Sequence, residues 1–431
     1  KDNVTLTKTW TPPTTDIVLC LNGKTITGPN GDGDEGYAIS FNNGAVFTIT
    51  DCNDGDEQGK ITHAEGDLGG GVNVVIGTFN MYGGIITGNT RSSNTSGVHV
   101  ATYQKFNMYG GSIRNNQGTT GGVGVDGGGS FRMYRGTIEN NIGTGTGGVG
   151  LYGSSSFEMS GGTIEKNTAT SVGGGVYVGG SATLTVSGSA KIISNTANGK
   201  SNNVYLSKNK AIAIGADGLK NGAQLGVTTE AAPQDNSPVV IVTGAAAGTD
   251  YSSIIKSDSS AYKVVRDSSD ATQLVLAVNA HKHYLCGGET CTKVGNHSDM
   301  VFTFTAWTDE AAQMQYSDPN ATAANCLPKT MDNWYLTGDV TLSEMWEPKN
   351  GTVLCLNGYS ITTTKDMADS VISVTDNRNF TLCDCHGGGK IARAEKSANN
   401  RIVEVNSGTF NMYGGELANG YVPAGGGIGT I

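Results

Sequence analysis

The sequence Phe79-Asn80-Met81-Tyr82-Gly83-Gly84 recurs letter for letter at residues 106–111 and again at residues 410–415. Altered copies occupy residues 131–136, 157–162 and 184–188, so the central Met or Val falls at positions 81, 108, 133, 159 and 186. The steps between these positions are 27, 25, 26 and 27 residues. A fixed period of this size indicates a repeat architecture in which one structural unit stacks on the next.

Each repeat contains three short apolar segments with the alternating pattern of strands, separated by turns rich in Gly, Asn, Ser and Thr. This pattern predicts an all-β fold, a right-handed parallel β-helix with three strands per coil, whose coils stack at roughly 4.8 Å. Equivalent residues should then form ladders along the axis. We expect an interior stack of Phe79, Phe106, Phe131 and Phe157. We also expect a ladder of mutually bonded Asn side chains, at turns that need the left-handed region: Asn89, Asn116, Asn141, Asn167 and Asn195.

A second module begins within the chain. The sequence of residues 18–23 returns at 353–358 without a change, and the context of residues 47–52 returns in altered form at 380–385. We therefore divide the chain into a β-helix module at 1–210, a β-rich cap at 211–280, a small connector at 281–335 and the start of a second module at 336–431. Both ends of the sequence fall inside a module, which predicts a slice of a longer tandem array.

Composition narrows the class of protein. Gly supplies 65 of 431 residues, charged residues make up only 15%, and the formal net charge is −10. The acidic balance and the lack of a basic stripe disfavour nucleic-acid binding. The sequence contains no apolar run long enough for a transmembrane helix, and no signal peptide.

The eight cysteines suggest the cellular setting. One pair, Cys20 with Cys52, recurs in a matching context as Cys355 with Cys385. Two copies of one pair predict disulfides that join neighbouring coils, and therefore an oxidising, extracellular environment. Buried free thiols are the alternative. The remaining Cys326 and Cys383 either pair with each other or stay free.

The connector carries the pattern His281-x-His283-x2-Cys286-x4-Cys291-x5-His297. Two imidazoles and two thiolates from this set could close a tetrahedral zinc site, which would stabilise a segment that has little core of its own. An oxidising environment favours a Cys286–Cys291 disulfide with exposed histidines over such a site, and the fold itself requires no cofactor. Calcium is less favoured than zinc, because the acidic loops at 30–35 and 54–57 lack the EF-hand spacing and do not recur in the second module.

Tyr82, Tyr109 and Tyr134 each follow an inward-facing Met and should form an outward ladder. Exposed aromatic rows can stack on sugar rings, so these residues are the candidates for glycan binding. The alternative is that the stacked rings only stabilise an open sheet face. Glu139 and Glu165 fall one coil apart, near the spacing of a retaining glycosidase, but they alternate outward from a buried Ile and predict a solvated face. We assign no catalytic residue.

The Cys-Leu-Asn-Gly start, the Phe-Asn-Met-Tyr-Gly-Gly coils and the His-x-His-x-x-Cys-Gly-Gly connector resemble the modular β-helix surface proteins of Gram-positive gut bacteria. The resemblance implies a secreted or cell-surface, adhesin-like protein with glycans or host surface proteins as partners. More remotely, the coils are similar to those of pectate lyases and polygalacturonases, whose catalytic motifs we do not find. We expect a structural rod that presents binding surfaces. The alternatives are a carbohydrate-active enzyme, either a glycosidase or a polysaccharide lyase, and a fibre-forming segment that associates end to end.

Overall fold

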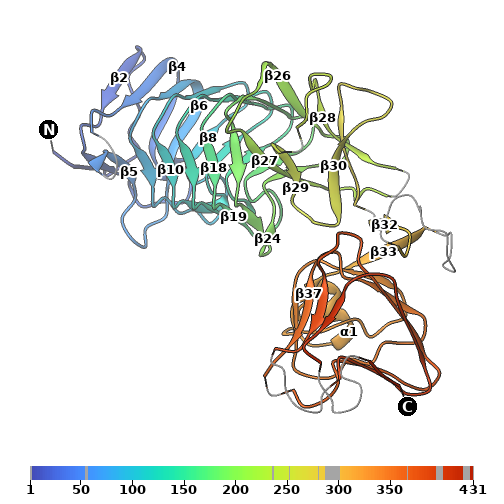
Figure 1. The fold of residues 1–431 in the computed structure, drawn as a ribbon. Coiled ribbons are helices and arrows are strands. Elements are labelled where there is room, and N and C mark those ends of the chain that lie inside the picture. The colour runs from blue at the N-terminus through green and yellow to red at the C-terminus, as the bar shows by residue number, and fades with distance from the viewer. Residues whose placement is uncertain are drawn as a thin grey trace. The chain divides into compact units, whose positions relative to one another are not determined.

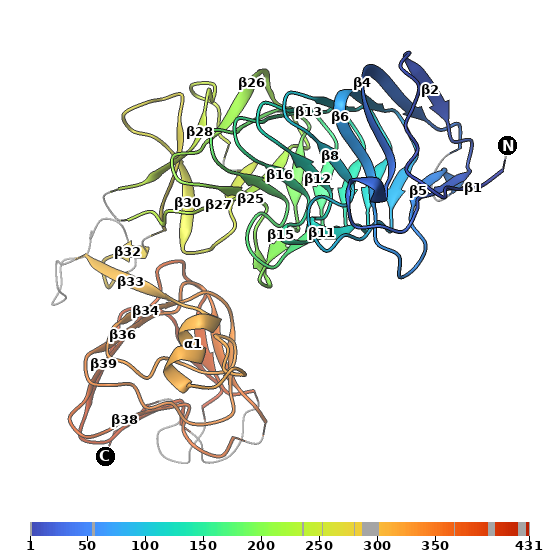
Figure 2. The ribbon, with the colours of Figure 1, turned by 180° about the vertical axis from the view of Figure 1, so that it is seen from behind.

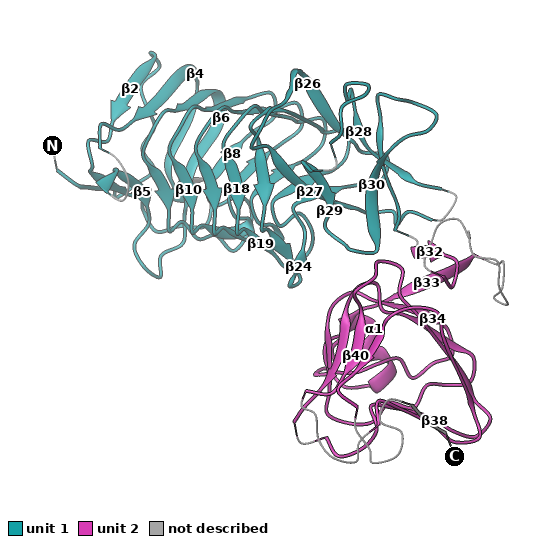
Figure 3. Ribbon diagram, viewed as in Figure 1, with its two compact units in different colours: residues 1–279 teal, residues 280–431 magenta. Residues whose placement is uncertain are grey.

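The computed structural model describes residues 2–53, 57–234, 237–251, 253–279, 281–286, 301–365, 367–394, 401–420 and 428–430. Its described part is almost entirely β-structure, with one α-helix, α1 (Asp309–Tyr316), and one short 3-10 helix, η1 (Asp34–Gly36). The chain forms two compact units, residues 1–279 and 280–431 (Figures 1 and 3). The predicted connector therefore belongs to the second unit, together with the second module.

Unit 1 is a parallel β-solenoid, as the repeat predicted, and its stacked coils are visible from both sides (Figures 1 and 2). Equivalent residues of successive coils pair in register, for example Val98 with Val123, Phe106 with Phe131 and Ile113 with Ile138. The Phe/Met face consists of β2 (Ile17–Cys20), β4 (Tyr37–Thr50), β6 (Gly70–Met81), β9 (Lys105–Met108), β13 (Ser130–Met133), β17 (Ser156–Met159), β21 (Thr183–Gly188) and β26 (Ile212–Leu219).

Two further faces, the Ile face and the Val face, complete each coil. The long strands β4 and β6 run from the Val face into the Phe/Met face. The Ile face contains β1 (Val4–Thr5), β3 (Thr25–Thr27), β5 (Lys60–Thr62), β7 (Ile85–Thr87), β10 (Ser112–Arg114), β14 (Thr137–Glu139), β18 (Thr163–Glu165), β22 (Lys191–Ile193), β27 (Gln224–Thr229) and β29 (Ile255–Ser257). The Val face continues through β8 (Val98–Val100), β12 (Val123–Val125), β16 (Val149–Leu151), β20 (Val176–Val178) and β25 (Val204–Leu206).

A fourth, shorter row of strands was not expected from the sequence. It follows the Asn position of each coil and consists of β11 (Gln117–Thr120), β15 (Ile142–Thr146), β19 (Thr168–Ala169), β23 (Thr196–Ala197) and β24 (Lys200–Ser201). These segments are rich in Gly and Thr and carry few apolar side chains, so their composition gives little strand signal.

The predicted Phe stack fills the interior. Phe79, Phe106, Phe131 and Phe157 are fully buried, and successive ring centroids lie 5.0, 4.7 and 4.5 Å apart with nearly parallel planes. Phe47 extends the stack by one ring at 5.9 Å. Close offset stacking combined with full burial makes this row a main source of apolar stabilisation in the coils.

The predicted Asn ladder is also present, with one correction to its backbone. Each Asn donates a side-chain N–H to the side-chain oxygen of the next, with distances from Asn89 to Asn195 of 2.8, 3.0, 2.9 and 2.9 Å. The left-handed residue is not the Asn itself but its predecessor, such as Asn115 (φ 54°), Asn140 (φ 53°) or Lys166 (φ 54°). The buried Asn amide turns inward, so the positive φ falls on the preceding residue at the outside of the corner.

The end of unit 1 leaves the regular pattern. Strands β26, β27 and β29 continue the parallel pairing, and β28 (Val239–Thr243) pairs parallel with β26. Strand β31 (Leu274–Val278) then pairs antiparallel with both β28 and β30 (Tyr262–Arg266). Leu274 and Leu276 are buried in the same core cluster as the coils. This group covers the apolar end of the solenoid, which would otherwise expose core side chains and unpaired edges.

Unit 2 repeats the solenoid plan on three smaller sheets. The first contains β32 (His281–His283), β33 (Phe302–Trp307), β34 (Asn333–Leu336), β36 (Thr352–Cys355), β39 (Asn379–Cys383) and β42 (Thr409–Met412). The second contains β35 (Val340–Leu342), β37 (Ser360–Thr363), β40 (Lys390–Ala392) and β43 (Glu416–Ala418), and the third contains β38 (Ile372–Val374), β41 (Val403–Val405) and β44 (Ile428–Thr430). Strands β32 and β33 pair antiparallel, and the second half of β33 pairs parallel with β34.

Candidate metal centre

Four potential metal ligands meet in unit 2. His281 and His283 alternate along β32, Cys355 ends β36, and Cys385 lies two residues beyond β39. One ligand atom from each of the four residues lies within 4.8 Å of the others. Strands β36 and β39 are neighbours in the sheet, so the two thiols come from adjacent coils.

Two distances between ligand atoms of the cluster fall in the range that a single tetrahedral ion requires. The sulfurs of Cys355 and Cys385 are 3.5 Å apart, and the Cys385 sulfur is 3.2 Å from Nε2 of His281. Tetrahedral zinc, with bonds of about 2.0–2.3 Å, requires ligand atoms to be about 3–4 Å from one another. His386 lies at the border of the site, with Nδ1 at 3.2 Å from the same sulfur.

His283 is oriented as a ligand. Its Nδ1 lies 2.6 Å from the carbonyl oxygen of Tyr284, so this nitrogen carries the proton and donates it to the carbonyl. Its Nε2 is buried and has no hydrogen-bond partner in the described protein. Metal-bound histidines commonly donate the other ring N–H to a carbonyl, which fixes the tautomer. A buried nitrogen lone pair without a partner is costly, and a cation would satisfy it.

Apolar and aromatic side chains enclose the four ligands. His281 stacks on Tyr335 with ring centroids 4.3 Å apart, and His283 stacks on Phe304 at the same distance. Phe304 and Tyr335 belong to a small buried cluster with Leu285, Val353, Cys355 and Cys383. This cluster lies on the face of the first sheet opposite the main core of the unit, and it brings Phe304 and Tyr335 of the connector together with Val353 of the second module.

The thiols lie in an environment that disfavours their negative charge. The neighbouring thiol of Cys383, together with burial, raises the pKa of Cys355 to about 12. Contact with Cys355 and burial raise the pKa of Cys385, and His281 and His283 act in the opposite direction. A divalent cation would supply the positive charge that two thiolates need in this apolar setting. Two sulfurs and two imidazole nitrogens are the donor set of structural zinc, and four protein ligands leave no open position for catalysis.

Two of the five residues that the sequence indicated as possible zinc ligands, His281 and His283, lie in this cluster. Cys286 is not part of the cluster, and Cys291 and His297 lie outside the described residues. The thiols come instead from Cys355 and Cys385, which the sequence assigned to a disulfide. A usable signal was present, because a His-x-His strand places both rings on one face and needs a second pair of ligands.

The predicted Cys20–Cys52 and Cys355–Cys385 disulfides are not formed in the structure. The predicted partners do lie side by side, with the sulfurs of Cys20 and Cys52 3.2 Å apart. Cys326 and Cys383 do not meet, because they belong to separate buried clusters. The Cys286–Cys291 alternative involves a residue outside the described part.

The tyrosine ladder of unit 1 is stacked and partly exposed. The rings of Tyr82 and Tyr109 lie 4.4 Å apart, and those of Tyr109 and Tyr134 lie 4.8 Å apart with an angle of 1° between them. Tyr82 and Tyr134 are 54% and 40% exposed. The pKa of Tyr109 is raised by burial and by its two neighbours. The flat row is accessible from solvent, as a surface for stacking on sugar rings would have to be.

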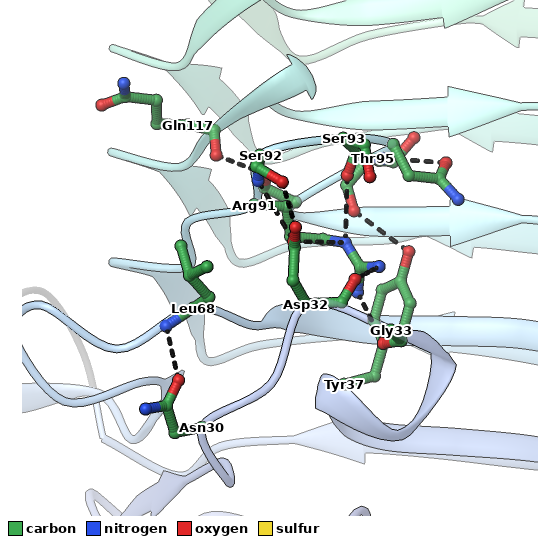
Figure 4. A network of polar contacts seen from close by, with 12 residues as sticks. Asn30, Asp32, Gly33, Tyr37, Leu68, Arg91, Ser92, Ser93, Thr95 and Gln117 are labelled. Atoms are coloured by element: carbon green, nitrogen blue, oxygen red, sulfur yellow. Dashed lines mark hydrogen bonds and ion pairs between the residues drawn. The ribbon is translucent and has the colours of Figure 1, made fainter.

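The acidic loop at Asn30, Asp32, Asp34 and Glu35 is fastened to the next coils by protein groups (Figure 4). Arg91 donates to the carbonyl oxygens of Asp32 and Gly33, while Ser92 donates to the Asp32 carboxylate. Asn30 accepts from the backbone of Leu68 at 3.0 Å. The guanidinium of Arg91 also lies 4.4 Å from the ring centroid of Tyr37. The Asp32 carboxylate has a cationic neighbour, since its Oδ1 lies 4.0 Å from Nε of Arg91.

The remaining carboxylates examined from the sequence belong to the sheet surface. Glu139 and Glu165 are register partners on β14 and β18, and both are half-buried. Glu139 also pairs in register with Arg114, and the Glu165 carboxylate accepts from Lys166 at 3.3 Å. Both carboxylates thus have a basic residue beside them on the sheet surface. None of the described helices has the length and apolar character needed to span a membrane.

Comparisons with known proteins leave the family of this chain open. No protein-family model matches it, and neither the curated proteins nor the solved structures contain a significant match. The chain is thus characterised by its own architecture, a parallel β-solenoid in two units with a His/Cys cluster in the second.

Proposed function

We propose that this chain is a non-enzymatic structural segment of a tandem β-solenoid protein, in which a structural zinc ion fixes each connector to the module that follows it. The observation that carries the proposal is the convergence of His281, His283, Cys355 and Cys385 within 4.8 Å. Two ligands come from the connector and two from the module, so the ion acts as a joint between them.

The energetics of the connector support a structural ion. Strand β32 adds no side chain to the main core of unit 2, whereas β33 adds Trp307 to that core and Phe304 to the small separate cluster. A strand such as β32, which adds no side chain to that core, gains stability from a bound metal ion or a disulfide. A structural zinc site contributes its binding free energy directly to folding, since its ligands meet only in the folded chain.

The architecture supports a rod that presents surfaces. Each solenoid coil contacts mainly its neighbours, so the fold extends by addition of coils or modules. The resemblance to modular surface proteins of Gram-positive gut bacteria supports placement outside the cell, at a bacterial surface. The partners we propose are glycans or host surface proteins, and the exposed ladder of Tyr82, Tyr109 and Tyr134 is the surface that favours glycans.

Metal analysis of the chain purified without chelators tests the joint. We expect one zinc per chain, and we expect cobalt substitution to give the intense sulfur-to-metal absorption of a thiolate site. Cys355→Ser and His283→Asn should abolish tight binding, whereas Cys20→Ser is the matched control that keeps it. An intact mass lower by two hydrogen atoms, with Cys355 bonded to Cys385 and no zinc, would refute the metal joint.

Glycan binding has its own test. Immobilised mixtures of bacterial and host polysaccharides should retain the chain, and replacement of all three ladder tyrosines by Ser should release it. Tyr205, a tyrosine outside this ladder, provides the control substitution. Equal retention of the two variants would remove the ladder from the proposal without affecting the zinc joint.

A further inference from the structure

Unit 1 contains a second copy of the thiol half of the metal centre. The sulfurs of Cys20 and Cys52 are 3.2 Å apart, compared with 3.5 Å for Cys355 and Cys385. In unit 1 the Cys52 thiol donates to the side-chain oxygen of Asn22 at 3.3 Å. In unit 2 the Cys385 thiol makes the equivalent contact with Asn357 at 3.5 Å.

The loops that carry these thiols are also held in the same way. The Asp51 carboxylate accepts from the backbone N–H groups of Gly23 at 3.2 Å and Gly59 at 2.6 Å. Asp384 accepts from Gly358 and Gly389 at 2.7 and 2.8 Å. The position of each thiol pair is therefore set by the solenoid itself. It does not depend on the histidine strand, which unit 1 lacks in its described part.

The two copies differ in what covers them. Val353 is 7% exposed beneath the connector, whereas its counterpart Val18 is 69% exposed. Both Cys20 and Cys52 are exposed. Strand β36 pairs with β34 on one side and β39 on the other, but β2 pairs only with β4 among the described strands. Unit 1 thus presents an apolar side chain, a free strand edge and two thiols on one face.

We propose that this face of unit 1 receives the connector of another copy of the module, and that a zinc ion held by Cys20, Cys52 and two histidines closes the joint. The occupant is a segment like residues 281–336, whose counterpart of β34 would pair with the free edge of β2. The inference rests on the proposed metal joint of unit 2, which shows the same face with its connector in place. Because the joined surfaces differ, the contact is head-to-tail and can be repeated along an array.

The test is a chain extended at its start by a copy of residues 280–336. Val4 pairs with Ile26 as Val340 pairs with Ile361, so Lys1 takes the place that Thr337 has in unit 2. We expect the zinc content to rise from one ion in the original chain to two in the extended chain. Alkylation of Cys20 and Cys52, mapped by peptide mass spectrometry, should slow to the rate of Cys355 and Cys385.

Two controls separate the outcomes. An extension in which both copied histidines are Asn should leave the chain with one zinc and with reactive Cys20 and Cys52. Cys20→Ser in the extended chain should return the count to one. One zinc in the extended chain, with the circular dichroism and melting of unit 1 unchanged, would overturn the inference and leave the unit 2 joint standing. Absence of zinc from the original chain would refute the proposed function itself.

Discussion

Asn141 offers the sharpest test of what holds the coils together. Its side chain is fully buried and makes four hydrogen bonds. It donates to the carbonyl of Ile113 and to the side-chain oxygen of Asn167, both at 2.9 Å. It accepts from the backbone and side-chain N–H groups of Asn116 at 3.1 and 3.0 Å. Asn141→Ala would leave two buried donors of Asn116 without these partners.

The size of the effect follows from those orphaned groups. Each buried donor left without a partner costs about 1–3 kcal/mol, so Asn141→Ala should lower the free energy of unfolding of unit 1 by about 2–6 kcal/mol. The adjacent Asn140 is the matched control, since it is exposed and has a φ of 53°. Asn140→Ala should cost only about 1 kcal/mol, from backbone strain in the left-handed region.

Urea unfolding followed by circular dichroism measures both variants, and hydrogen exchange shows where protection is lost. Exchange should rise first in the coils on both sides of residue 141. Asn141→Asp is a second test variant. It keeps the shape of the side chain, but a carboxylate oxygen replaces the N–H donors and faces the acceptor oxygens of Ile113 and Asn167. It should cost at least as much as Asn141→Ala. Equal losses in the Asn141→Ala and Asn140→Ala variants would refute the ladder as a source of stability.

Four further predictions follow from the same structure. Burial holds the pKa of His63 below its ordinary value of 6.5, so the unfolded chain takes up this proton at a higher pH than the folded chain. The stability of unit 1 should therefore fall as the pH drops below about 6.5, and His63→Gln should flatten this dependence in melting experiments. Phe131→Ala should cost about 3–5 kcal/mol in urea unfolding, because it empties the centre of a buried stack. Tyr109→Ala, at a partly exposed stack, should cost only about 0.5–1.5 kcal/mol in the same assay. A chelator should lower the melting temperature of unit 2 but not of unit 1, as read by calorimetry, and Cys355→Ser should remove this sensitivity.

The fold could be predicted in detail because each sequence repeat corresponds to one coil of the solenoid. Phe106 and Phe131 occupy equivalent places in the period, so their stacking follows once the coils are stacked. The hydrogen bonds between the side chains of the Asn ladder follow in the same way. The sequence did not predict the fourth strand row. Strands such as β15 pair through backbone groups and carry few of the apolar side chains by which a strand is recognised.

The His/Cys cluster could be predicted only in part, for a physical reason. His281 and Cys385 are separated by 104 residues, and their meeting depends on β32 packing onto the outer face of a solenoid sheet. The repeat period predicts which side chains point outward from a coil, but it does not predict which other segment packs on them. The histidines were therefore assigned to the cysteines nearest in sequence, although Cys286 lies outside the cluster.

The disulfide and metal interpretations concern the same sulfur atoms, and the covering strands decide between them. A thiol pair enclosed with two imidazoles is shielded from oxidants and has nitrogen ligands at hand, as for Cys355 and Cys385. The equivalent pair, Cys20 and Cys52, is exposed and has no such neighbours in the described chain, so oxidation to a disulfide competes with metal binding there. Oxidation would remove the thiolates that a docking connector needs. In the proposed head-to-tail joint the order of events matters, because a module that docks before oxidation would gain the metal ion, whereas one oxidised first would keep a disulfide and a free strand edge.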